Sequence, residues 1–175
     1  MSNQEQSSEM EATPKMSDKL PEDKAEELIR KHTYTSMALG LIPVPFVDFV
    51  GVAGIQLNMV RKIANTYDIS FTQEAFKNTL GALIGGAIPG IAGMPLASLM
   101  KAVPIIGQGL GVLSMPVVAG ASTYAIGKVF YRHFASGGSF LTFDPDKARD
   151  YYQEQFKHGE KIVTDMMNKK KSETI

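Results

Sequence analysis

Few side chains in this sequence have the type and spacing that catalysis or metal binding requires. There is no Cys, which excludes disulfides, thiolate zinc sites and cysteine nucleophiles. No two of the three histidines, His32, His133 and His158, have the spacing of a helical metal site. Ser122 and Thr123 lie in apolar sequence without an identifiable base, and helical hydroxyls of this kind more often bond a backbone carbonyl. The sequence therefore predicts a protein that is not an enzyme and has no metal site.

The glycine patterns that cradle nucleotides are incomplete. Gly127-Lys128 is followed by Val129, whereas a phosphate-binding loop needs Ser or Thr after the Lys. The run from Gly107 to Gly111 resembles a dinucleotide loop, but its last required glycine is replaced and no strand leads into it. The net charge is zero, so no basic excess favours nucleic acid. We expect no cofactor and no nucleic-acid partner.

Asp48 is the one charged residue in a long apolar stretch. A buried carboxylate is costly unless it is paired or lies near a boundary. In one interpretation, Asp48 caps a helix that starts after two prolines, where amide groups are free. In the other, it joins Gln56 and Lys101 in an interior polar seam that holds helices in register. Met59 and Tyr67 fall on the same helical stripe as Gln56 and are further candidates for interhelical contacts.

Charge is concentrated at the two ends of the sequence. Residues 1–31 hold 13 charged side chains and residues 128–175 hold 16, whereas the 96 residues between them hold seven. Within that middle part, residues 79–127 carry a single charge, Lys101. A polar head and a polar tail therefore flank an apolar middle, which suits a membrane or a tightly packed partner better than catalysis.

The apolar stretch 79–127 is also rich in glycine, with ten glycines and four prolines. Glycines four apart, such as Gly81 and Gly85, let two helices approach closely. Gly107 and Gly127 are candidates for structural or interaction positions of the same kind. So many glycines in helices need compensation from close packing, because each costs about 1 kcal/mol against Ala in water.

The same stretch is long enough for two membrane crossings of roughly 20 residues each. Residues 37–60 are a third candidate for a crossing. The four prolines, however, argue against two straight helices. They favour a hairpin of broken helices that pivots near Lys101, either partly inserted in lipid or buried by the other helices.

Helix signals occur along most of the chain and predict an all-α fold, a helical bundle around this hairpin. A first helix begins at Pro21, which suits the first helical position, and runs toward Leu39. A second helix is expected from about residue 45 to residue 67. Ser70 or Thr72 caps a third helix.

The remaining segments differ in character. Residues 1–20 are polar and predict a disordered tail. Residues 21–140 form the predicted main domain. In residues 141–175, Asp144 and Pro145 mark the start of an amphipathic helix that ends in a basic tail.

Two blocks of the sequence form a further pattern over about residues 25–140. The first is Ile42-Pro43-x-Pro45-x-x-Asp48, then Gln56-x-x-Met59-Val60, Ile63-Ala64 and Tyr67. The second is Ala97-Ser98-Leu99-x-Lys101-x-x-Pro104-x-x-Gly107, then Thr123-Tyr124-Ala125-Ile126-Gly127, Tyr131 and Phe134. In both blocks the chain resembles the YcjF-like domain family of unknown function.

The resemblance implies a helical module that is often associated with membranes and that often occurs beside GTPase domains. This chain contains no GTPase domain, so such an enzyme would be a separate polypeptide. The family supplies no catalytic residues to transfer. Residues 1–20 and 145–175 lie outside the resemblance.

Together, these observations favour a non-enzymatic, membrane-associated accessory protein that faces the cytoplasm, with lipid, a separate GTPase or a second copy as partner. One alternative is a cytoplasmic soluble interaction module that buries the hairpin. Another is a pore-forming or membrane-perturbing protein that releases the hairpin onto lipid. The three differ in what covers residues 79–127.

Overall fold

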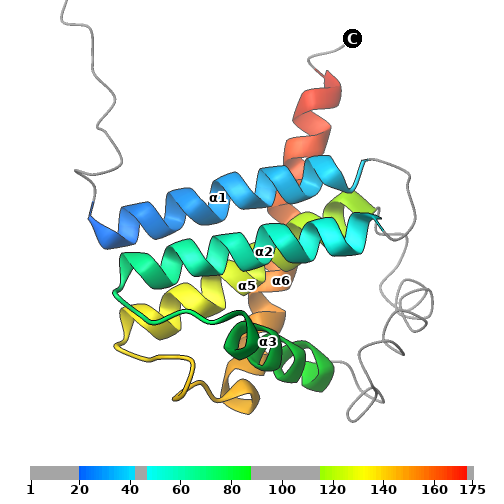
Figure 1. The fold of residues 1–175 in the computed structure, drawn as a ribbon. Coiled ribbons are helices and arrows are strands. Elements are labelled where there is room, and N and C mark those ends of the chain that lie inside the picture. Colours follow the sequence, from blue (N-terminus) through cyan, green and yellow to red (C-terminus); the bar gives the residue numbers. More distant parts are fainter. Residues whose placement is uncertain (1–19, 42–46, 88–114, 173–175) are drawn as a thin grey trace, which may run out of the picture.

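A computed structural model of the chain describes residues 20–41, 47–87 and 115–172. These ranges contain five helices and no strand, which confirms the all-α prediction (Figure 1). The predicted disordered tail and the centre of the predicted hairpin lie outside the described residues. The helices are α1 (Pro21–Leu39), α2 (Val47–Thr66), α3 (Gln73–Ala87), α5 (Met115–Ala135) and α6 (Pro145–Ser172).

Local signals account for where several helices begin. Pro21 opens α1 and is followed by acidic side chains in the first turn, as predicted. Of the two predicted caps for α3, the hydroxyl of Thr72 accepts a hydrogen bond from the Ala75 amide at 3.2 Å. This satisfies one of the amide groups that a helix start leaves unpaired.

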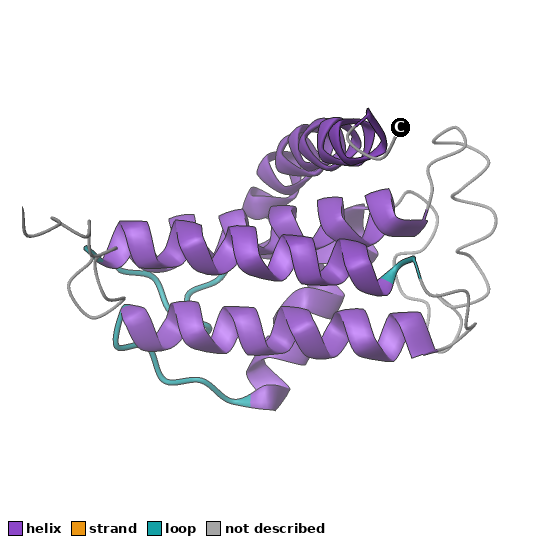
Figure 2. Ribbon diagram, turned by 90° about the horizontal axis from the view of Figure 1, so that it is seen from above, coloured by secondary structure: helices purple, strands orange, loops and turns teal. Residues whose placement is uncertain are grey.

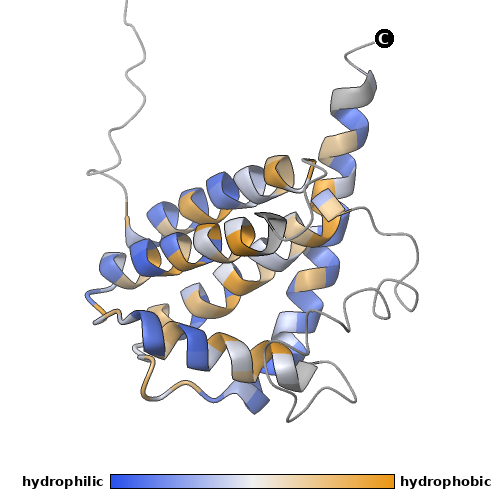
Figure 3. Cartoon of the chain, turned by 45° about the vertical axis from the view of Figure 1, so that its right-hand side comes forward, coloured by the Kyte–Doolittle hydropathy of each residue, from blue (hydrophilic) through white to orange (hydrophobic). Residues whose placement is uncertain are grey.

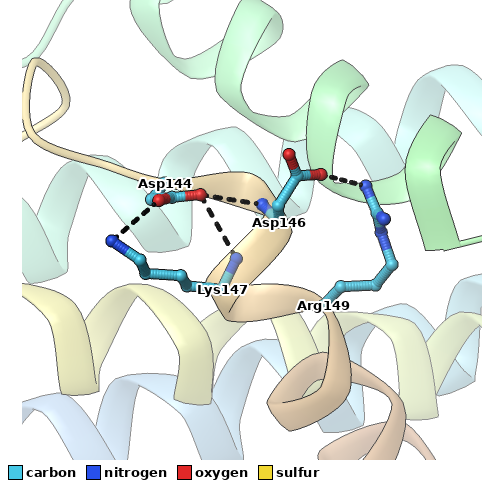
Figure 4. Close-up of polar contacts among 4 residues, drawn as sticks. All are labelled: Asp144, Asp146, Lys147 and Arg149. Atoms are coloured by element: carbon cyan, nitrogen blue, oxygen red, sulfur yellow. Dashed lines mark hydrogen bonds and ion pairs between the residues drawn. The ribbon is translucent and has the colours of Figure 1, made fainter.

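Asp144 caps α6, as the sequence predicted (Figure 4). Its Oδ1 accepts hydrogen bonds from the amides of Asp146 and Lys147 at 3.1 and 3.2 Å, and its Oδ2 pairs with the Lys147 ammonium at 3.1 Å. These bonds, led by the Lys147 amide, hold the pKa of the Asp144 carboxyl below its ordinary value. In the same turn, Arg149 pairs with Asp146 at 2.6 Å.

Helix α5 is the central element of the bundle and packs against α1, α2 and α6. Helices α1 and α2 run antiparallel beside it, and α6 crosses α5 steeply (Figures 1 and 2). Helix α3 packs against α6. The fully buried side chains between these helices include Ile29, Met59, Leu83, Ile126 and Phe130. Burial of each such side chain is worth about 1.5–3 kcal/mol, so this core dominates the stability of the described bundle.

The loop between α5 and α6 is fixed by aromatic packing. Phe140 and Phe143 place their rings 5.6 and 5.3 Å from the ring of Phe130, and Phe140 also lies 5.2 Å from Phe134. Between them, Leu141 points outward and is 97% exposed. The short apolar segment of this loop thus partly buries its two aromatic residues and leaves its leucine in solvent.

Candidate functional site

A layer of uncharged polar side chains crosses the interior of the bundle. We call it the polar layer; its members are Ser36 of α1, Gln56 of α2, Ser122 and Thr123 of α5, and Tyr152 of α6. The Thr123 hydroxyl donates to Ser36 Oγ at 2.8 Å. Gln56 Nε2 donates to the hydroxyl oxygens of Ser122 and Thr123, both at 3.3 Å. The layer therefore joins helices that lie far apart in the sequence.

The polar layer contains no charged side chain. Tyr152 shares a hydrogen bond with the Ser122 hydroxyl, while burial raises the pKa of its phenol. The expectation that Ser122 and Thr123 bond backbone carbonyls was wrong. Gln56 and Ser36 bring side-chain partners to them across the helix interfaces, and such partners are invisible in local sequence.

The structure describes only part of the predicted polar seam. Gln56 lies in the interior, 5% exposed, among the partners just named. Asp48 is the second residue of α2, so its backbone lies in the first helical turn, while its side chain is outside what the structure describes. Lys101 also lies outside the described residues. The joining of Asp48 and Lys101 to Gln56 stays a prediction.

The other two residues on the α2 stripe have different surroundings. Met59 is fully buried in the core. The Tyr67 hydroxyl is buried and has no hydrogen-bond partner among the described residues, and its ring lies 6.3 Å from that of Tyr131. Burial, followed by the neighbouring Tyr131 and the charges of Glu22 and Glu26, raises the pKa of Tyr67 to about 12. Tyr67 therefore stays a neutral phenol at ordinary pH.

Glycines of α5 and α6 mark close contacts between helices. A Cβ placed on Gly127 would lie 2.7 Å from Ile29 Cγ1 and 3.1 Å from Met59 Cε. One placed on Gly159 would lie 3.0 Å from the Cα of Ala121. Side chains of any size at these positions would force the helices apart. Gly107, the other predicted contact glycine, lies outside the described residues.

The glycine pair that the sequence singled out on α3 behaves differently. A Cβ on Gly81 or Gly85 would meet nothing within 4 Å. The expectation that this pair marks a close helix approach was wrong for the described part of the chain. Helix α3 buries Phe76 and Leu83 instead, and its glycines lie off that face.

The described residues contain no cluster of three or more His, Asp or Glu side chains able to hold a metal ion. Each histidine has a structural contact. His32 Nδ1 lies 2.7 Å from the Leu28 carbonyl oxygen, and burial lowers the pKa of this imidazole. His133 Nε2 lies 2.8 Å from the Ser139 carbonyl oxygen, and His158 packs edge-on against a tyrosine ring.

One end of the bundle is poor in charge. The end of α1 and the starts of α2 and α5 meet there: a Cβ on Gly40 would lie 2.9 Å from the Pro116 backbone, and one on Gly51 would collide with Leu39. We call this region the charge-poor end; it comprises residues 32–41, 47–60 and 115–127. Its only charged residue is Asp48. Figure 3 shows the change from hydrophilic to hydrophobic residues along α1 and α2.

Three large apolar side chains are exposed at the charge-poor end. Val50 is 76% exposed, Leu41 57% and Met115 40%. Helix α3 follows the same trend, because its last charged residue is Lys77 and its final ten residues are uncharged. Four helices therefore have one end without, or almost without, charged residues, as is true of the stretch 79–127.

The opposite end of these helices is charged and aromatic. The Lys128 ammonium of α5 pairs with the Glu26 carboxylate of α1. It also lies over the ring of Tyr131, at 5.8 Å from its centre, and over that of Tyr124 at the border of the charge-poor end, at 5.7 Å. Helices α1, α2 and α5 thus present two chemically different ends. Helix α6, which carries Lys161 and Asp165 beside Val163, packs against Gly120 of the charge-poor end.

Within the described part of the chain, none of the helices combines the length and the apolarity needed to cross a bilayer. The third candidate crossing, residues 37–60, is not one helix, because α1 ends at Leu39 and α2 begins at Val47. Gly40 is the C-cap residue of α1, and the two prolines that follow it in the sequence lie outside the described residues. About half of the other two candidate crossings falls in residues 88–114, outside the described residues.

Comparison with known proteins places the chain in a family. The family model described as "Domain of unknown function (DUF697)" matches residues 8–161. The chain belongs to this family. The match is broader than the resemblance drawn on residues 25–140, and it includes the first part of α6, which packs against α5.

A named relative is also similar over most of its length. Magnetosome membrane protein 22 of Magnetospirillum gryphiswaldense is 35% identical over 152 residues, which cover 86% of this chain and 78% of that protein. No solved structure matches this DUF697 protein significantly. The family description assigns no activity, so function has to be argued from the residues.

Proposed function

We propose that this DUF697 protein is a membrane-associated helical accessory protein without catalytic activity. The proposal rests on the charge-poor end: three segments of the chain that come together there carry one charge among them. A soluble bundle has no reason to sort its charges along its axis, since charged side chains improve solubility at both ends. A bundle that meets lipid at one end does have such a reason.

The sequence between the described helices extends this pattern. Helix α3 ends and α5 begins within the stretch 79–127, whose single charge is Lys101. The segment that connects these two helix ends therefore begins and ends in uncharged sequence. The printed name of the relative from Magnetospirillum gryphiswaldense describes that protein as a membrane protein, which supports the same conclusion for this chain.

The absence of catalysis is supported by the chemistry of the interior. The hydroxyls of the polar layer bond one another and Gln56, so none is paired with a base that would activate it. Each described histidine has its own contact, with a carbonyl or with an aromatic ring. An accessory role, in which binding is the function, needs no such groups.

The finer proposal is that the charged end faces the cytoplasm and meets a protein partner. The family resemblance suggests a separate GTPase, and self-association is the other option. Tyrosine and arginine are frequent at protein interfaces, and Arg132 lies over the ring of Tyr151 at 4.4 Å on this side of the bundle. A pull-down with the full chain that never enriches a GTPase would remove that partner.

A soluble interaction module is the second candidate function. It is favoured by a specific observation, the well-packed core of the described helices without any spanning helix among them. In that case residues 79–127 would be covered by protein. The pore-forming alternative is tested separately, by dye release from liposomes over a range of pH and lipid charge.

Cell fractionation distinguishes the proposed function from the soluble module. We expect the full chain in the membrane pellet, retained in a high-salt wash because its charge-poor end offers no ion pairs for salt to screen. A cytosolic enzyme and a spanning protein of the same cells serve as markers. Recovery of the whole protein in the soluble fraction would contradict membrane association.

A further inference from the structure

We infer that two copies of this chain associate by exchanging the basic ends of their α6 helices, each of which enters an acidic groove of the other copy. The inference develops the self-association that the proposed function names as one option for a partner, and it does not depend on membrane association. It adds the two surfaces that meet and the charges that join them.

An open groove of about 560 Å³ is lined by residues of α1, α5 and α6. On the side of α6 it is apolar, because Ile162 and Met166 line it and both are half-buried. On the side of α1 it is mostly acidic, with three carboxylates and one guanidinium: Asp23, Glu26, Glu27 and Arg30. Such a groove suits a segment that combines apolar side chains with cations.

The carboxylates of the groove have room for further cations. Asp23 is exposed and has no ion pair among the described residues. Glu26 and Glu27 pair with Lys128 and Lys31 of the same copy, but the two oxygens of a carboxylate can accept hydrogen bonds from more than one cation. On α6, residues 160–168 add two acidic side chains and one basic one, so the apolar side of the groove brings no excess of positive charge.

A buried polar group at the groove also lacks a partner. Thr33 lines the groove and is 2% exposed, and its hydroxyl has no hydrogen-bond partner among the described residues. A buried hydroxyl without a hydrogen bond is destabilising. An ammonium that enters the groove can donate to it, so this observation points to a ligand with donors, independently of the acidic side chains.

The end of α6 has the chemistry that the groove suits. The sequence contains a single run of three consecutive cations, residues 169–171, in the last turns of this helix. Lys169 is exposed and has no ion pair among the described residues. The half-buried Met166 and Met167 precede it, so apolar and cationic side chains lie together on this segment.

A second copy is the source of this segment. Helix α6 continues to Ser172, and its last turns extend beyond the other helices (Figure 1). Two other segments of the chain fit less well, because residues 1–19 carry four acidic and two basic side chains and residues 88–114 carry one cation. Since the groove wall and the basic end belong to the same helix, two copies can exchange these ends about a two-fold axis.

Charge reversals test the exchange with little risk to the fold. Asp23→Lys and Lys169→Glu each reverse an exposed charge that has no ion pair among the described residues. The matched control for the first is Glu74→Lys, because Glu74 is also exposed and also lies in the first turn of a helix. Both changes therefore carry the same penalty from the helix dipole. Lys77→Glu, on the exposed surface of α3, is the control for the second.

The experiment is sedimentation equilibrium of the purified full chain in a non-ionic detergent, at low and at high salt. We expect a dimer whose dissociation constant rises in high salt and rises about tenfold for each single reversal, while the controls leave it unchanged. The double variant Asp23→Lys/Lys169→Glu exchanges the two charges and should restore association to near the wild-type value. Far-UV circular dichroism checks that each variant is folded.

Thr33→Val adds a readout that a purely structural role would not give. The valine keeps the shape of the side chain and removes the hydroxyl, so the dissociation constant should rise severalfold. In high salt, where the chain is monomeric, the free energy of unfolding should not fall, because the hydroxyl has no partner there.

Several outcomes would overturn the inference. These are a chain that is monomeric at low salt, a dimer that is insensitive to both reversals, an equal loss for the controls, or a double variant no better than the single ones. A monomer whose Lys169→Glu variant loses binding to vesicles of phosphatidylglycerol would assign the basic end to lipid. Fractionation keeps the two proposals apart: a dimer found soluble in cells contradicts only the proposed function, and a monomer in the membrane pellet contradicts only this inference.

Discussion

Glycine has different surroundings on different helices: it is packed on α5 and α6 and open on the described side of α3. At Gly127 and Gly159 a single added carbon would press on a neighbouring helix, whereas at Gly81 and Gly85 it would meet no atom of the described residues within 4 Å. In the first group, glycine is needed because another helix approaches closely, with the Ile29 side chain at Gly127 and the Ala121 backbone at Gly159. In the second, glycine only weakens the helix. A glycine pattern therefore indicates packing only where the three-dimensional neighbours are known.

The largest expected effect that tests this comparison comes from Gly127→Val. The added Cβ would collide with Ile29 and press on Met59, so we expect the free energy of unfolding to fall by about 3 kcal/mol. Urea denaturation measures this. The same substitution at Gly81, where no neighbour lies within reach, is the control and should be close to neutral. Equal losses at the two positions would abolish the distinction.

A smaller effect is expected from Gly159→Ala. Its Cβ would approach the Cα and the carbonyl oxygen of Ala121, at 3.0 and 3.1 Å, and backbone atoms cannot rotate away as a side chain can. We expect a loss of about 1–2 kcal/mol, net of the gain in helix propensity. Thermal and urea unfolding report the change. An unchanged or raised free energy of unfolding would mean that α6 can shift away from α5 without loss of stability.

Ser122 and Thr123 of the polar layer lie on α5 between Gly127 and Gly120, where a Cβ would also lie close to another helix, 2.8 Å from Val163 Cγ2. Gln56→Leu removes two hydrogen bonds of 3.3 Å, so we expect a loss of about 1 kcal/mol. A double-mutant cycle with Thr123→Val measures the coupling between the two side chains by urea denaturation. Strict additivity would show that the bonds contribute no coupling energy.

The smallest effect, of opposite sign, is expected on α3. Gly81→Ala and Gly85→Ala should each raise the free energy of unfolding by up to about 1 kcal/mol, because alanine favours the helix and meets no neighbour. Urea denaturation of the purified chain measures the gain. A loss at both positions would indicate that another molecule, such as a second copy, covers this face in solution.

Local sequence predicted the helices well, because their signals are local. Pro21 and Asp144 act through their own backbone geometry and nearby amides, and both start helices as expected. The candidate site was harder to predict. Gln56 was singled out, but its partners Ser122 and Thr123 were expected to bond carbonyls. Nothing in the sequence shows that residues 66 or more positions apart face each other.

What the sequence by itself determined is the distribution of charge and the start of several helices, since composition and capping do not depend on distant contacts. Only the tertiary structure decided which glycines are packed and which are free. It also assembled the charge-poor end, where Leu41, Val50 and Met115 become one surface. The physical reason is that these properties depend on how helices are oriented about one another, and orientation is set by the burial of the whole core.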